Sequence, residues 1–129
     1  MVSEWKPQGY NSVSVYLVAD GAQQVIDFLT NAFGAMGLRR FDTPEGKVLH
    51  AELRVGDTVV MVADAGGAYP AFPVWLHVYV PDVDETYKKA LAAGGLSVQE
   101  PIRKVGDPDK RGGVKDPCGN TWWISTQVE

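Results

Sequence analysis

Side chains able to do chemistry recur at every second position of several predicted strands. In an extended strand, alternate side chains point to opposite faces of a sheet, so residues two apart share a face. One face then carries mainly aromatic side chains with a few polar groups among them. These residues are Ser14, Tyr16, His50, Glu52, Trp75, His77, Tyr79 and Trp123. A mostly apolar groove with a few polar groups is the usual composition of a small-molecule site.

Several of these residues admit more than one role. His50 and Glu52, two apart on one strand, can bind a metal ion, act as a base with its orienting carboxylate, or form an ion pair on a solvated face. His77 can be a pocket histidine, a residual metal ligand or an ordinary strand histidine. Trp75 and Trp123 can line a pocket or belong to the core, to which large aromatic side chains contribute strongly.

An internal repeat predicts the elements that hold these residues. Residues 13–35 and 74–95 each read as a strand, a turn containing Asp and a helix, and three short strand-like runs follow each helix. This pattern predicts two βαβββ units, at about 12–64 and 74–127, joined by a linker rich in Gly, Ala and Pro at about 64–73. A unit of this size buries too little surface to be robust alone. We therefore expect one α+β domain over the whole chain.

Apolar stripes at spacings of three and four residues predict the two helices. Asp20 is the expected N-cap of the first helix, and Gly34 follows its end. Asp82 or Asp84 caps the second helix, which ends at Gly94. The predicted buried stripes are Ala22, Val25, Ile26, Leu29 and Phe33 in the first helix and Val83, Tyr87, Ala90 and Leu91 in the second.

The aliphatic faces of the strands are expected to pack beneath the helices. The strand that carries Ser14 and Tyr16 is predicted over 12–19, and the last strand over about 120–127. Alternation along the last strand directs Trp123 to the groove and its neighbour Trp122 to the helices. Other residues predicted to face the helices include Leu49, Ala51, Leu53 and Ile124.

Composition limits the classes of function. The chain has 129 residues, 45% of them hydrophobic, which is enough for a core. Its formal net charge of −4 provides no basic field for phosphates, so we expect no nucleic-acid partner. The single cysteine, Cys118, excludes an internal disulfide. The start, MVSEWKPQGYNS, lacks the apolar stretch of a signal peptide, and no run is long enough to span a membrane. The sequence therefore predicts a cytoplasmic protein without a membrane partner.

Three segments of the sequence resemble those of a known family. KVLHAELRVGDTVVMVAD, LHVYVPDVDETYKKALAAG and RGGVKDPCGNTWWISTQVE, in this order and spacing, resemble the glyoxalase and bleomycin-resistance proteins of the vicinal-oxygen-chelate superfamily. The resemblance runs from about Ser12 to the end of the chain. It implies two modules that form a curved mixed sheet around a cavity, often completed by dimerisation. We therefore expect a homodimer, which would also cover open sheet edges.

The metal site implied by this resemblance is where the sequence departs from the family. Metalloenzymes of the superfamily take His, Glu or Gln ligands from the first and last strands of each module. The matching positions hold Ser14, Met61, Trp75 and Trp123, whereas a catalytic zinc or iron needs about three good protein ligands. We therefore predict that no metal or other cofactor is bound, although a register shift of two residues would bring His77 to one of these positions.

Three hypotheses of function follow. The first is a non-catalytic protein that sequesters an aromatic or otherwise hydrophobic small molecule, as resistance members of the superfamily do. The second is a superfamily metalloenzyme, a lyase, isomerase or dioxygenase, with a shifted site around His50, Glu52 and His77. The third is a structural or protein-binding module whose aromatic face is buried in a dimer.

Overall fold

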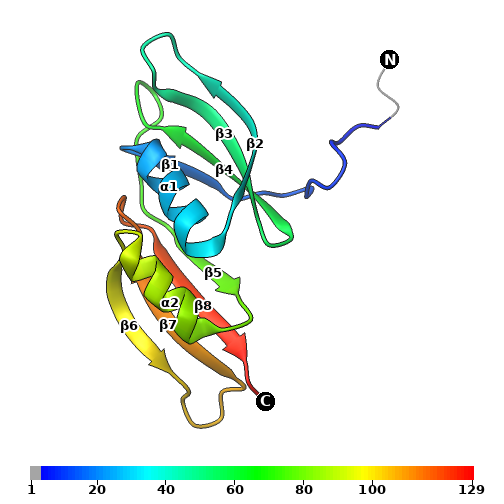
Figure 1. Ribbon diagram of the computed structural model, residues 1–129. Helices are drawn as coiled ribbons and strands as arrows, with labels where there is room; N and C mark the ends of the chain where they lie inside the picture. The colour runs from blue at the N-terminus through cyan, green and yellow to red at the C-terminus, as the bar shows by residue number, and fades with distance from the viewer. Residues whose placement is uncertain (1–3) are drawn as a thin grey trace.

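The computed structural model describes residues 4–129 and contains two βαβββ modules (Figure 1). The first module consists of β1 (Tyr16–Ala19), α1 (Ala22–Phe33), β2 (Met36–Asp42), β3 (Val48–Val55) and β4 (Thr58–Asp64). The second consists of β5 (Trp75–Tyr79), α2 (Val83–Ala92), β6 (Leu96–Ile102), β7 (Asp109–Lys115) and β8 (Thr121–Gln127). The repeat seen in the sequence is therefore a repeat of structure.

Each module forms its own four-stranded mixed sheet. The strand orders are β1-β4-β3-β2 and β5-β8-β7-β6, and the first strand of each module runs parallel to the last. The α+β fold of two βαβββ modules is thus confirmed. One detail is corrected: the strands of residues 4–129 belong to two sheets and are not hydrogen-bonded into a single curved one. The reason is that β1 and β5 are both edge strands, each paired only within its own module.

One continuous core holds the two modules together. Each helix lies across one face of its own sheet (Figure 1), and α1 packs against α2. Phe28 of α1 is completely buried, and the ring of Phe33 lies 5.1 Å from that of Trp122 in β8. Because the apolar side chains of both modules join one buried cluster, neither module hides its apolar surface alone. We call the face of each sheet that points away from the helices its open face.

Two strand predictions are corrected. Strand β1 begins at Tyr16 and not at residue 12, so Ser14 lies in the segment that leads into it. Leu49 was expected beneath α1 but is 60% exposed, whereas Ala51 and Leu53 are buried there as predicted. The cause is a register shift: Phe41 pairs with His50, and the next pair is Asp42 with Val48, so Leu49 is the bulged residue.

The start of α1 also differs from the prediction. The N-cap is Gly21 and not Asp20, and its φ of 113° is a conformation that favours glycine. Gly21 has no side chain to accept the first free N–H of the helix. The carboxylate of Asp64, at the end of β4, accepts the N–H of Ala22 at 2.8 Å in its place. Helix α2 starts as predicted, because Asp82 accepts the N–H of Glu85.

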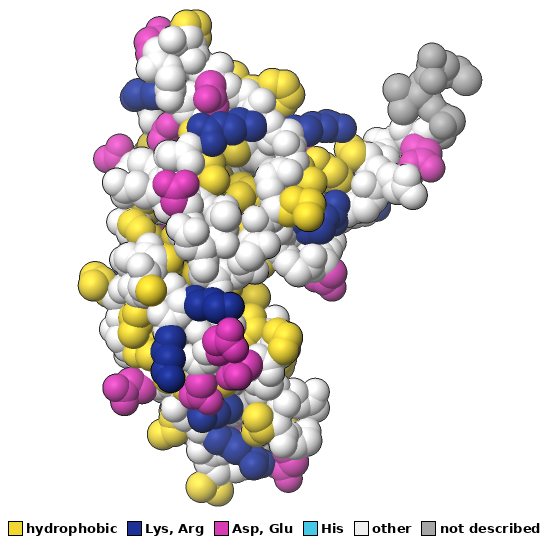
Figure 2. All heavy atoms as spheres, in the orientation of Figure 1, with side chains coloured by type: hydrophobic (Ala, Val, Ile, Leu, Met, Phe, Trp, Pro, Cys, Tyr) yellow, Lys and Arg dark blue, Asp and Glu magenta, His cyan; other side chains and the backbone are white. Residues whose placement is uncertain are grey.

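The surface carries charges of both signs. On the face seen in Figure 2, Lys and Arg side chains are interspersed with Asp and Glu, and hydrophobic side chains lie between them. Within residues 4–129, no helix is both long enough and apolar enough to cross a membrane.

Candidate functional site

The structure divides the predicted site residues between the open faces of the two sheets. Tyr16, His50 and Glu52 lie on the first sheet, with Ser14 half-buried just before it. The second sheet carries Trp75, His77, Tyr79 and Trp123. The single groove expected from alternation is therefore two surfaces within one chain. The alternation of side chains along each strand predicted which face a residue lies on. It could not predict that these faces belong to two separate sheets.

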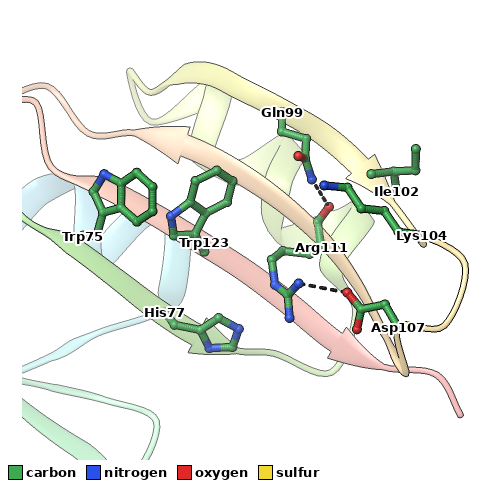
Figure 3. A pocket seen from close by; sticks show the side chains of 8 residues that line it. All are labelled: Trp75, His77, Gln99, Ile102, Lys104, Asp107, Arg111 and Trp123. Carbon is green, nitrogen blue, oxygen red and sulfur yellow. Dashed lines mark hydrogen bonds and ion pairs between the residues drawn. The ribbon is translucent and has the colours of Figure 1, made fainter.

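A pocket of about 330 Å³ opens on the second sheet (Figure 3). Its walls come from β5, β6, β7, β8 and the loop between β6 and β7. One wall is aromatic, and the other carries charged and amide groups. The lining residues are Trp75, His77, Gln99, Ile102, Lys104, Asp107, Arg111 and Trp123.

Two tryptophans form the aromatic wall. Trp75 in β5 and Trp123 in β8 have ring centroids 5.3 Å apart and planes at 70°, an edge-to-face contact. The side chain of Trp75 is 76% exposed. Trp123 is half-buried, and its Nε1 donates to no atom of residues 4–129. A large apolar surface and an unpaired N–H are therefore both left at this wall.

Gly113 in β7 decides where Trp123 lies. The two residues are paired across the sheet, and a Cβ atom built on Gly113 would lie 2.7 Å from the Trp123 ring. Any side chain at position 113 would therefore displace the ring. Sequence reasoning missed this role, although the two adjacent glycines Gly112 and Gly113 inside a predicted strand are the signal of a close approach.

Arg111 organises the polar wall. Its guanidinium donates to Asp107 at 3.0 Å, to Asp109 at 3.1 Å and to the Ser125 hydroxyl at 2.9 Å. The pKa of Asp107 is lowered by the Asp109 backbone N–H and by the Arg111 charge. The carboxylates of Asp107 and Asp109 offset the positive charge of Arg111 and hold its guanidinium in place. Arg111 therefore gives the polar wall a fixed shape and is not a free cation. In the sequence, Arg111 ends a charged segment, residues 104–111, of a kind that is more often solvated than functional, so sequence reasoning did not assign it to the site.

His77 and Tyr79 belong to the same network. His77 Nε2 lies 2.9 Å from the Ser125 hydroxyl, and partial burial and the nearby Arg111 charge lower the pKa of His77. Tyr79 donates its hydroxyl to Asp109 at 2.6 Å, and this bond raises the pKa of the phenol. Both side chains are therefore fixed in their neutral forms beside the tryptophan wall.

The open face of the first sheet carries a separate chain of hydrogen bonds. Tyr16 Oη lies 2.7 Å from His50 Nδ1, and His50 Nε2 lies 2.7 Å from Glu52 Oε2. Tyr10, from the segment before β1, donates its hydroxyl to the other oxygen of Glu52 at 2.5 Å. Burial disfavours the charged form of Glu52, but the bonds from Tyr10 and His50 outweigh it and lower the pKa of the carboxyl. Glu52 is therefore a buried carboxylate held by donors on both sides.

These residues do not fit the metal site of the family. Trp75 and Trp123 offer an indole N–H, which donates and does not coordinate, and Met61 offers only a thioether. In the alternative set, His50 and Glu52 lie on the first sheet and His77 lies on the second. Across residues 4–129, no three His, Cys, Asp or Glu side chains are grouped as a metal site. The side chains at the matching positions therefore do not suit a bound metal ion.

We predict that a chelator leaves stability unchanged. A bound ion raises the melting temperature only if it binds the native state, and the matching positions offer it no ligand set. The measurement is a thermal melt of purified protein with and without EDTA, followed by separate addition of nickel, zinc and iron. A drop with EDTA that one of these ions reverses would contradict the prediction and support the metalloenzyme hypothesis.

Comparison with known proteins places the chain in a family. The model of the Glyoxalase/Bleomycin resistance protein/Dioxygenase superfamily matches residues 11–124, and the chain belongs to this superfamily. An uncharacterized protein of Mycobacterium bovis is 35% identical over 128 residues, covering 91% of this chain and 84% of the relative. An uncharacterized protein of Mycobacterium tuberculosis is also 35% identical, covering 91% of this chain and 75% of its own length.

Solved structures share the same fold. TioX from Micromonospora superposes with a TM-score of 0.76 at 28% identity, covering 91% of this chain and 98% of TioX. Glyoxalase I from Zea mays superposes with a TM-score of 0.73 at 18% identity, covering 90% of this chain and 44% of the maize protein. At that identity the maize enzyme supports the fold alone.

Proposed function

We propose that this protein binds and sequesters an aromatic or otherwise hydrophobic small molecule at the tryptophan wall, without catalysis. The observation that carries the proposal is the exposure of Trp75 beside Trp123. An indole that is 76% exposed on a sheet face leaves apolar surface in water that a flat ligand would cover. Each aromatic contact contributes about 0.5 to 1.5 kcal/mol beyond the burial of area.

The polar wall supports binding more than chemistry. A general acid or base must be free to exchange a proton with a substrate. In this pocket Arg111 is held by Asp107 and Asp109, and Ser125 lies between Arg111 and His77. Such a network fixes the orientation of a ligand. The Ser125 hydroxyl lies within hydrogen-bond distance of His77, but it is completely buried and also accepts from Arg111, so it does not favour a nucleophilic role. Membership in a superfamily whose description includes resistance proteins is consistent with this role.

The experiment is a fluorescence titration. We expect a planar polycyclic aromatic compound, selected from a thermal-shift screen, to quench tryptophan emission saturably and to raise the melting temperature, because ligand binding to the native state stabilises it. Turnover of the same compound is followed by mass spectrometry, and none is expected. Linear, non-saturable quenching by every compound of the screen would contradict the binding proposal, and a modified product would contradict the absence of catalysis.

We also propose that the protein is a homodimer, because β1 and β5 leave sheet edges unpaired within residues 4–129. The expected result is a sedimentation-equilibrium mass of twice 14.0 kDa at micromolar concentration. A mass near 14.0 kDa throughout this range would contradict it.

A further inference from the structure

The tryptophan wall borders two cavities. The first is the pocket of about 330 Å³ described above, which we call the Arg111 pocket. The second has a volume of about 470 Å³, and we call it the Lys115 pocket. The two cavities share only Trp75 and Trp123. The other residues that line the Lys115 pocket are Leu96, Ser97, Val98, Lys115 and Thr121.

The register of the second sheet places Trp123 between the two cavities. In β7, Arg111, Gly113 and Lys115 follow one another at every second position, so they share the open face. Their partners in β8 are Ser125, Trp123 and Thr121, in that order. The Trp123 ring lies over Gly113, the middle position. Lys115 is therefore on one side of the ring and Arg111 on the other.

The Lys115 pocket is positive. Among the residues that line it, only Lys115 is charged, and none of the ion pairs within residues 4–129 involves Lys115. The unpaired Nε1 of Trp123 lies on the side of its ring nearer Trp75 and away from Arg111 (Figure 3). Trp75 pairs with Thr121, in the row of Lys115. This N–H is a donor and adds its partial positive charge to the same end of the wall.

The charges of the Arg111 pocket are balanced. Its two cations are Lys104 and Arg111. The carboxylates of Asp107 and Asp109 both accept from the Arg111 guanidinium, so two negative groups lie beside two positive ones. The positive charge that remains unbalanced along the tryptophan wall is therefore that of Lys115.

We infer that the ligand of the tryptophan wall is an aromatic anion, whose flat ring lies on Trp75 and Trp123 and whose carboxylate or other negative group lies at Lys115. The inference rests on the proposed function and adds the sign of the ligand's charge and the direction in which the ligand lies. The whole chain carries a formal net charge of −4, so its overall field repels an anion. A preference for an anion must therefore come from a local cation, and Lys115 is the specificity-determining residue.

Three probes with the same ring test the sign of the charge. At neutral pH, 2-naphthoate is an anion, 2-naphthamide is neutral and 2-naphthamidine is a cation. An exposed ion pair predicts that the wild-type protein binds 2-naphthoate roughly threefold to fivefold more tightly than 2-naphthamide. The amidine should bind more weakly than 2-naphthoate. NMR titrations give each Kd, and the preference should shrink in about 1 M NaCl, where charges are screened beyond about 3 Å.

Substitutions of single lysines locate the negative group. Lys115→Gln should abolish the preference for 2-naphthoate and leave the binding of 2-naphthamide unchanged, and Lys115→Arg should retain the preference. Lys88→Gln is the matched control, because it removes one exposed positive charge from α2, which covers the opposite face of the sheet. Lys104→Gln should keep most of the preference. Far-ultraviolet circular dichroism and a melt confirm that the variants are folded.

The outcomes separate this inference from the proposed function. Trp75→Ala should weaken 2-naphthoate and 2-naphthamide alike and leave their ratio unchanged. Equal binding of these two probes by the wild-type protein, or tighter binding of the amidine than of 2-naphthoate, would overturn the inference and leave the proposed function intact. A preference that persists in Lys115→Gln, or that is lost in Lys104→Gln, would overturn the role given to Lys115. Failure of all three probes to bind would also overturn the inference, and the compound screen described above would then decide the proposed function on its own.

Discussion

Replacing Trp75 or Trp123 by alanine is expected to weaken binding of a planar aromatic ligand by about 2 kcal/mol, or about thirtyfold in Kd. Each substitution removes one of two indoles that contact each other edge to face, so the ligand loses both a stacking surface and buried area. The exposed Trp75 contributes little to the core. Its loss should therefore change affinity far more than stability.

The measurement is a fluorescence or calorimetric titration of each variant with the compound selected for the wild-type protein. Trp5→Ala is the matched control, because Trp5 is 85% exposed and lies in the segment before β1. We expect that variant to bind like the wild type. Unchanged affinity in both Trp75→Ala and Trp123→Ala would contradict the assignment of the ligand to this wall.

Replacing Trp122 by alanine is expected to lower the free energy of unfolding by about 3 to 5 kcal/mol. Trp122 is 2% exposed, packs on Phe33 and donates its Nε1 proton to Asp116 at 3.0 Å. The substitution opens a cavity between the modules and removes one donor from a buried carboxylate. A chemical-denaturation curve measures the loss.

Trp122→Phe provides a graded control for this prediction. It retains much of the ring volume against Phe33 but loses the bond to Asp116, so its effect should lie between those of wild type and Trp122→Ala. Trp5→Ala should leave the denaturation midpoint unchanged. If Trp122 governed ligand affinity while Trp75 and Trp123 governed only stability, the assignment of helix-facing and open faces would be inverted.

Adjacent tryptophans show what alternation can predict. Trp122 and Trp123 follow each other on β8, and the period of two correctly placed the first under the helices and the second on the open face. Leu49 shows where this reasoning fails. A bulge interrupts the pairing of β2 with β3 and exposes a residue that strict alternation buries. Nothing in the local sequence marks that shift, because it depends on the partner strand.

The site was predicted less completely than the fold. Aromatic and polar residues were assigned to the open faces from their own strands, which is local information. Gln99, Lys104 and Arg111 enter the pocket only because β6 pairs with β7 and β7 with β8. The division of the site between two sheets depends on how the modules pack. Pairing and packing of this kind are not encoded in the periodicity of any single strand.

The single cysteine of the sequence lies at the junction between the modules. Cys118, in the loop between β7 and β8, has its Sγ 3.4 Å from the carbonyl oxygen of Gly21 at the start of α1, and burial raises the pKa of its thiol. The thiol is only half-buried, and its raised pKa reduces the fraction of reactive thiolate at neutral pH. The rate of alkylation at this one position therefore depends on how the junction covers the sulfur. Because the sequence holds no second cysteine, the measurement needs no background mutations, and slower alkylation on adding a ligand would report that binding covers the thiol further.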